Sequence, residues 1–113
     1  MTVKDAQNQI NAAVTNWDGV AARPHRFGGT EYRIGRREIG HIHGDYVVDI
    51  PFPTKIREEL VAAGRADPHH ILPDSGWVSF YIREPADVER AIELLQQSYE
   101  IAINQRKRRN NQE

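Results

Sequence analysis

The sequence contains no cysteine, carries almost no net charge and lacks a long hydrophobic run. The missing thiols exclude disulfides, thiolate metal ligands and a cysteine nucleophile, and they agree with a reducing compartment. A formal net charge of -1 gives no general attraction to nucleic acid or to an anionic membrane. No window approaches the roughly 18 apolar residues of a membrane helix, and the N-terminal segment has no apolar stretch of signal-peptide length. We therefore expect a cytoplasmic protein without a membrane partner, and nucleic acid is not an expected partner.

The length and composition predict one folded domain. With 113 residues, 39% of them hydrophobic and 27% charged, the chain is long enough for one hydrophobic core but not for two. Residues 106–113 contain no apolar side chain to bury, so we expect a basic, disordered C-terminal tail there. The expected domain therefore spans residues 1–105.

Apolar side chains at helical spacing predict helices over residues 2–17 and 54–63, and a long helix that begins at Pro85. Thr2 with Asp5, and Thr54, are placed to cap the first two helices. Residues 18–29 contain turn-forming glycine and proline, and we expect a loop there.

Alternating patterns predict strands over residues 30–34, 37–43, 46–50 and 77–82, and a short strand that buries Ile71 and Leu72. Ile39 and Ile42 have opposite parity, and Gly40 between them indicates a β-bulge. The expected fold is a single small α+β domain, a mainly antiparallel sheet of about five strands packed against helices, in the order α-β-β-β-α-β-β-α.

Residues 38–53 contain the most unusual chemistry of the sequence. His41 and His43 are two positions apart, so an extended strand places both rings on one face. Asp45 and Asp49 follow on the next run. His69 and His70 are adjacent in a segment bounded by prolines and point to opposite faces, so at most one of them is expected in a shared pocket. We select His70.

The residues alone leave three interpretations of the His41 and His43 pair open. The rings could form structural hydrogen bonds with backbone carbonyls and Asp49 in a packed hairpin. They could act as a base or anchor a ligand, or they could bind a metal. A metal site needs three or four ligands. The pair supplies two of them, and His69, His70, Asp45 or Asp49 could supply the remainder.

Three motifs together resemble the luciferase-domain family, which includes the fungal luciferases. They are EYRIGRREIGHIHGD, DIPFP and PHHILPDSGWVSFYI, and the resemblance extends over about residues 17–99. It implies an α+β fold, and the order of elements is also similar to that of YjbR-like proteins.

For the fungal luciferases, the resemblance implies oxidation of an enolic pyrone by molecular oxygen without a metal or flavin cofactor. A histidine, His41 or His43, would remove a proton, and Arg33 or Arg37 would hold the resulting anion. The expected partner is thus a small enolic or anionic molecule, and the enzyme class would be a cofactor-independent oxygenase. Alternatives are a non-catalytic protein-interaction module and a metal-binding protein that uses His41 and His43. The residues expected to bind the ligand are Arg33, Arg37, Asp45, Asp49, His70 and Trp77.

Overall fold

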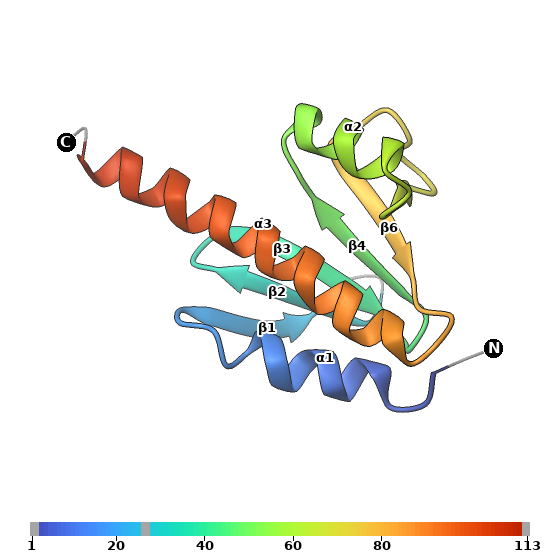
Figure 1. Ribbon diagram of the computed structural model, residues 1–113. Coiled ribbons are helices and arrows are strands. Elements are labelled where there is room, and N and C mark those ends of the chain that lie inside the picture. Colours follow the sequence, from blue (N-terminus) through green and yellow to red (C-terminus); the bar gives the residue numbers. More distant parts are fainter. Residues whose placement is uncertain (1–2, 26–27, 112–113) are drawn as a thin grey trace.

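The computed structural model describes residues 3–25 and 28–111 of the chain (Figure 1). Within these residues the chain forms three helices and six strands of one α+β domain. In chain order they are α1 (Ala6–Val14), β1 (Val20–Pro24), β2 (Thr30–Ile34), β3 (Arg37–His43), β4 (Val47–Pro51), α2 (Thr54–Ala62), β5 (Asp67–Pro68), β6 (Trp77–Tyr81) and α3 (Ala86–Asn111).

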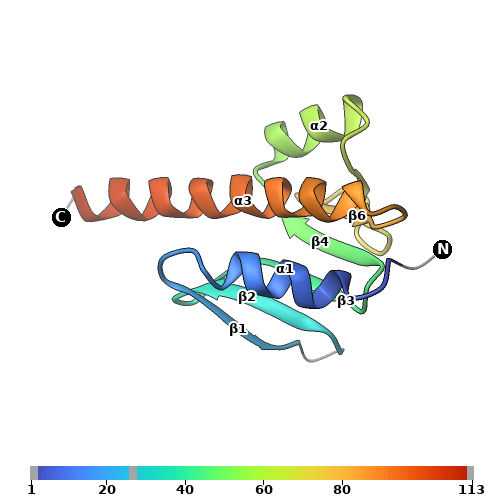
Figure 2. The same ribbon diagram turned by 60° about the horizontal axis from the view of Figure 1, so that its bottom comes forward.

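The strands form a single antiparallel sheet in the order β1-β2-β3-β4-β6-β5. The helices α1 and α3 lie on the same face of this sheet, and Figure 2 shows them one beside the other above the strands. The hydrophobic core fills the space between this face and the two helices. Its fully buried members include Ile10, Val14, Ile39, Ile42, Val48, Ile50, Val78, Leu94 and Leu95.

The structure confirms the α+β class and the antiparallel sheet, but it corrects the loop expected over residues 18–29. Residues Val20–Pro24 form the edge strand β1, which pairs with β2 from Val20 opposite Ile34 to Pro24 opposite Thr30. Four of its five side chains are exposed, so β1 has no alternation of apolar and polar residues that would predict a strand. The next strand in the chain, β2, supplies the pairing.

The short strand expected to bury Ile71 and Leu72 is also corrected. The fifth strand is Asp67–Pro68, and the side chains of Ile71 and Leu72 are 71% and 51% exposed. These two apolar residues therefore do not belong to the hydrophobic core.

The β-bulge predicted next to Gly40 is confirmed and shapes the site. Tyr32 pairs with Gly40 and Arg33 pairs with Glu38, so Ile39 is an extra residue in β3. The extra residue reverses the alternation of the strand, which lets Ile39 and Ile42 both enter the core. It also brings Glu38 to the face of His41, three positions later, where a regular strand would place them on opposite faces.

The ends of the helices differ from the expectations. Thr2 lies outside the described residues, and Asp5 precedes α1 without a side-chain capping bond. Pro53, not Thr54, occupies the capping position of α2. The helix α3 continues to Asn111, so residues 106–111 are helical where a disordered tail was expected, and the side chains of residues 106–110 are exposed. Arginine, lysine and glutamine favour helix, and cations are favourable near a helix C-terminus.

Candidate functional site

The face of the sheet opposite α1 and α3 carries a pocket that all five histidines of the chain line. His41 and His43 point from β3 to this face, and Asp49 of β4 lies directly across from His41 in the strand register. His69 and His70 approach from the segment after β5, and His25 from the end of β1. The sheet alternation separates these polar groups from their apolar neighbours in the same strands.

Asp49 is the centre of the cluster. Its Oδ2 atom lies 3.2 Å from Nε2 of His41, 3.6 Å from that of His43, 3.5 Å from that of His69 and 3.4 Å from that of His70. Its Oδ1 atom accepts a hydrogen bond of 2.7 Å from the hydroxyl of Ser79. Asp49 is only 1% exposed, so these partners compensate for the removal of its charge from water.

Carboxylates also lie on the outer side of two of the imidazoles. Nδ1 of His41 is 2.6 Å from Glu38 Oε2, and Nδ1 of His25 is 3.1 Å from Glu31 Oε1. Glu31 in turn pairs with Arg33. The rings of His25 and His41 stack with their centroids 4.1 Å apart. Each carboxylate therefore fixes the orientation of a ring in the cluster.

The hydrogen bonds of His69 determine the tautomer of its neutral ring. Its Nδ1 atom accepts hydrogen bonds from the backbone N–H groups of Ile71, at 3.1 Å, and Leu72, at 3.0 Å. In the neutral ring the proton must then be on Nε2, which faces Asp49. His69 thus orders the loop and lies in the cluster together with His70, so the expectation that at most one of these adjacent residues would join the pocket is wrong.

Hydrogen bonds and neighbouring charges shift the pKa values of the ionisable groups in the pocket in different directions. Burial alone would lower the pKa of His41, but its hydrogen bonds to Asp49 and Glu38 outweigh burial and raise this pKa to about 9. Burial likewise opposes the charge of Asp49, yet the hydrogen bonds from His41 and Ser79 hold its pKa well below the usual range. At neutral pH, His41 is therefore an imidazolium that bridges two carboxylates.

The other two perturbed histidines stay neutral at that pH. Burial and the neighbouring charge of His41 lower the pKa of His43. Burial is also the main cause that lowers the pKa of His69. The site therefore places a proton donor, His41, beside a ring that can accept a proton, His43, with ring centroids 4.9 Å apart.

The pocket has a volume of about 460 Å³ and combines this polar cluster with apolar side chains. Trp77 lies beside His41, with ring centroids 5.3 Å apart, and Ile71 and Leu72 complete the lining. Such a volume accommodates a small organic molecule.

Three of the residues expected at the site lie elsewhere. Arg33 pairs with Glu31 and donates to the backbone oxygen of Arg36, and Arg37 bonds to Gln105 of α3. Asp45 accepts a hydrogen bond from the backbone of Gln7 at the start of α1. Among the described residues that line the histidine pocket there is no arginine, whereas His41, His43, Asp49, His70 and Trp77 all lie there.

Sequence reasoning missed two members of the cluster, His25 and Glu38, and it set His69 aside in favour of His70. His25 follows strand β1, which the sequence did not predict. Without that strand, the sequence gives no reason to place His25 beside His41. The signal for Glu38 was present, because the predicted bulge changes which side chains of β3 share a face.

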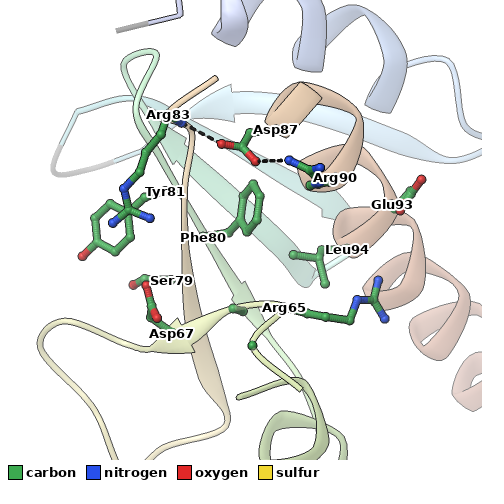
Figure 3. A pocket seen from close by; sticks show the side chains of 12 residues that line it. Arg65, Asp67, Ser79, Phe80, Tyr81, Arg83, Asp87, Arg90, Glu93 and Leu94 are labelled. Carbon is green, nitrogen blue, oxygen red and sulfur yellow. Dashed lines mark hydrogen bonds and ion pairs between the residues drawn. The ribbon is translucent and has the colours of Figure 1, made fainter. Parts of the chain in front are cut away.

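A second pocket of about 470 Å³ lies between β5, β6 and the start of α3 (Figure 3). Two of its charged side chains, Asp87 and Arg90, form an ion pair. The carboxylate of Asp87 accepts from the backbone N–H groups of Arg83 and Glu84 and pairs with Arg90. These contacts anchor the first turn of α3, so we assign them a structural role.

Fold and site together define a small α+β protein with a histidine and carboxylate pocket on one face of an antiparallel sheet. The model of the Luciferase domain family matches residues 36–98, more than half of the chain, and the protein belongs to this family. The matched segment includes β3, β4 and the His69–His70 loop, but not His25. No curated protein and no solved structure matches the chain. In the described part of the chain, no helix is both long and apolar enough to cross a membrane.

Proposed function

We propose that the protein binds a small, planar organic molecule in the histidine pocket. The observation that carries this proposal is the exposure of Ile71 and Leu72 at the edge of a pocket with a polar floor. Large apolar side chains that lie beside one another in solvent commonly mark a binding surface. Here the Nδ1 atom of His69 holds their backbone in place.

The lining suggests the chemical class of the ligand. Trp77, Ile71 and Leu72 offer apolar contacts to a flat ring system, while the imidazoles around Asp49 offer donors and acceptors to its oxygen atoms. An enolic or aromatic carboxylic compound has both features. The assignment of His41 and His43 as the reactive pair, and of molecular oxygen as the co-substrate, extends the proposal from binding to catalysis.

The sharpest test uses a residue that contributes little to the fold. Ile71→Ser removes an exposed apolar side chain, so it should leave unfolding unchanged and weaken a ligand that covers this residue about tenfold. Tyr46→Ser is the matched control, because Tyr46 is 56% exposed and is not among the residues that line the pocket. Affinities are measured by calorimetry with the compounds that a thermal-shift panel of enols and aromatic carboxylates selects.

Equal affinity of the Ile71→Ser and Tyr46→Ser variants would contradict binding at this pocket. For any compound that binds, oxygen consumption by the wild type and by His43→Gln then tests catalysis separately. Binding without oxygen consumption supports a binding protein and excludes the oxygenase interpretation for that compound.

A further inference from the structure

We propose that the histidine pocket holds a divalent transition-metal ion, bound by imidazole nitrogens of His25, His41 and His43 and by the carboxylate of Asp49. The inference deepens the proposed function by naming a cofactor for the same pocket. Its test uses the metal ion alone, so it can fail while binding of an organic molecule stands.

The spacing of the nitrogen and oxygen atoms fits a metal centre. Zinc-to-nitrogen and zinc-to-oxygen bonds of about 2.0–2.1 Å place neighbouring tetrahedral ligands about 3.3 Å apart. Asp49 Oδ2 is 3.2 Å from Nε2 of His41 and 3.6 Å from Nε2 of His43. His25, His41 and His43 each offer a ligand atom, and these atoms lie within 4.8 Å of one another; Asp49 forms a second such group with His69 and His70.

Hydrogen bonding does not account for this convergence. Four imidazole Nε2 atoms lie within 3.6 Å of one carboxylate oxygen, which has only two lone pairs. His41 and His70 form hydrogen bonds with Asp49 Oδ2 at 3.2 Å and 3.4 Å, and Nε2 of His69 faces the same oxygen from 3.5 Å, so more rings approach this atom than its lone pairs can serve. A cation that accepts lone pairs from several nitrogens gives these rings a common partner, because each neutral imidazole then needs no proton on the atom that faces inward.

The outer carboxylates provide an independent observation. An imidazole that binds a metal almost always donates its other N–H to a carboxylate, a backbone carbonyl or a water, and this contact fixes the tautomer. His41 has Glu38 in this position and His25 has Glu31. In the neutral rings these contacts keep the proton on Nδ1 and leave a lone pair on Nε2.

The same reasoning excludes His69 from the ligand set. Its Nδ1 atom accepts two backbone N–H groups, so the neutral ring carries its proton on Nε2 and offers no lone pair toward Asp49. The side chain of His70 is 40% exposed at the rim, and we leave it outside the set. His41 and His43 are therefore expected to bind the ion and His69 is not, although the Nε2 atoms of all three lie 3.2–3.6 Å from Asp49 Oδ2.

The ligand chemistry defines the class of ion. Three imidazoles and one carboxylate suit zinc, cobalt, nickel or copper, whereas magnesium and calcium prefer all-oxygen sites. We therefore expect zinc and cobalt to bind, and magnesium to compete poorly.

The test is a calorimetric titration of the metal-free protein with zinc chloride and, separately, cobalt chloride. We expect one ion per chain. His43→Gln should weaken zinc binding at least about a hundredfold because it removes a ligand, and Glu38→Gln should weaken it about 10- to 100-fold through the orientation of His41. Arg37→Gln is the control, because Arg37 bonds to Gln105 outside the pocket, and its affinity should equal that of the wild type.

A measurement on the wild type covers the case in which a variant does not fold. In a zinc titration followed by NMR of the imidazole nitrogens, the rings of His25, His41 and His43 should shift to the signals of metal-bound nitrogen, and Nε2 of His69 should keep its proton. Absence of stoichiometric zinc binding to the wild type would overturn the proposal. So would unchanged affinity in a folded His43→Gln variant, or metal-bound signals for His69 instead of His41.

Discussion

The two faces of the β3–β4 hairpin differ in what their side chains do. On the face toward α1 and α3, Ile42 and Val48 are fully buried among other apolar side chains. On the opposite face His41 and Asp49 are almost as well buried, at 8% and 1% exposure, but their surroundings are ionisable. Side chains that alternate along these strands are thus buried on both faces. One face stabilises the fold, and the other carries a buried polar site.

Burial on the polar face does not stabilise the fold in the way that burial on the apolar face does. A buried charge costs free energy unless it is paired, so Asp49 depends on the imidazoles and on Ser79. Such a cluster is a weak source of stability and a strong constraint on geometry. We therefore expect substitutions on the two faces to affect different measurements.

The largest effect on stability is expected on the helix face. Ile42→Ala removes a fully buried side chain and leaves a cavity, so the free energy of unfolding should fall by about 2–5 kcal/mol. Denaturant unfolding measures this change. A loss below about 1 kcal/mol would show that the helix face is not the main source of stability.

The next prediction concerns the residue where the two faces meet. In Gly40→Ala, the new methyl group would lie 2.5 Å from Cδ2 of Leu95 and 3.2 Å from the backbone oxygen of Asp49. We expect a loss of about 1–3 kcal/mol from this overpacking. Gly40 precedes His41 in β3, so we expect the rearrangement around the new methyl group to lower zinc or ligand affinity as well. Unchanged stability and unchanged affinity would refute the close approach of α3 to the bulge.

A smaller effect is expected at the start of α3, away from both faces. Asp87→Asn weakens the hydrogen bonds to the backbone N–H groups of Arg83 and Glu84 and should cost about 1 kcal/mol at neutral pH. Burial would raise the pKa of Asp87, but the backbone N–H of Arg83 and the side chain of Arg90 lower it overall. A lowered pKa means that the contribution is present at neutral pH and is lost on acidification below about pH 4. Unfolding curves of wild type and variant should therefore converge in acid, and a constant difference would contradict this assignment.

The smallest effect on stability is expected on the polar face. The side chain of His43 is 23% exposed, and its Nε2 atom is 3.6 Å from Asp49, so His43→Ala should cost less than about 1 kcal/mol. The same variant should lose most of the metal or ligand affinity. A loss of several kcal/mol in a protein that binds nothing would instead show that the histidines are structural.

The comparison of the faces also explains how far the sequence could predict the structure. The strands β2, β3 and β4 were predictable because each combines β-branched or aromatic residues with turn signals at both ends. The bulge was predictable from the parity of Ile39 and Ile42 around Gly40. Strand β1 was not predictable, because its exposed side chains have no pattern and its existence depends on pairing with β2.

The candidate site was predictable in its centre and not at its edges. The spacing of His41 and His43 fixed their common face, and the strand register then placed Asp49 beside them. Residues far apart in the chain, such as His25, meet the cluster only through tertiary structure. The arginines were assigned from the chemistry that the family resemblance implied, and Arg33 and Arg37 have partners outside the pocket.

The most direct test of the central claim, that the polar face is a binding site, is a thermal-shift measurement of the metal-free wild type. Whatever binds the folded state more tightly than the unfolded state raises the melting temperature. The account predicts a rise with zinc or cobalt, and a rise with at least one planar enolic or aromatic carboxylic compound. An unchanged melting temperature with all of these ions and compounds would contradict it.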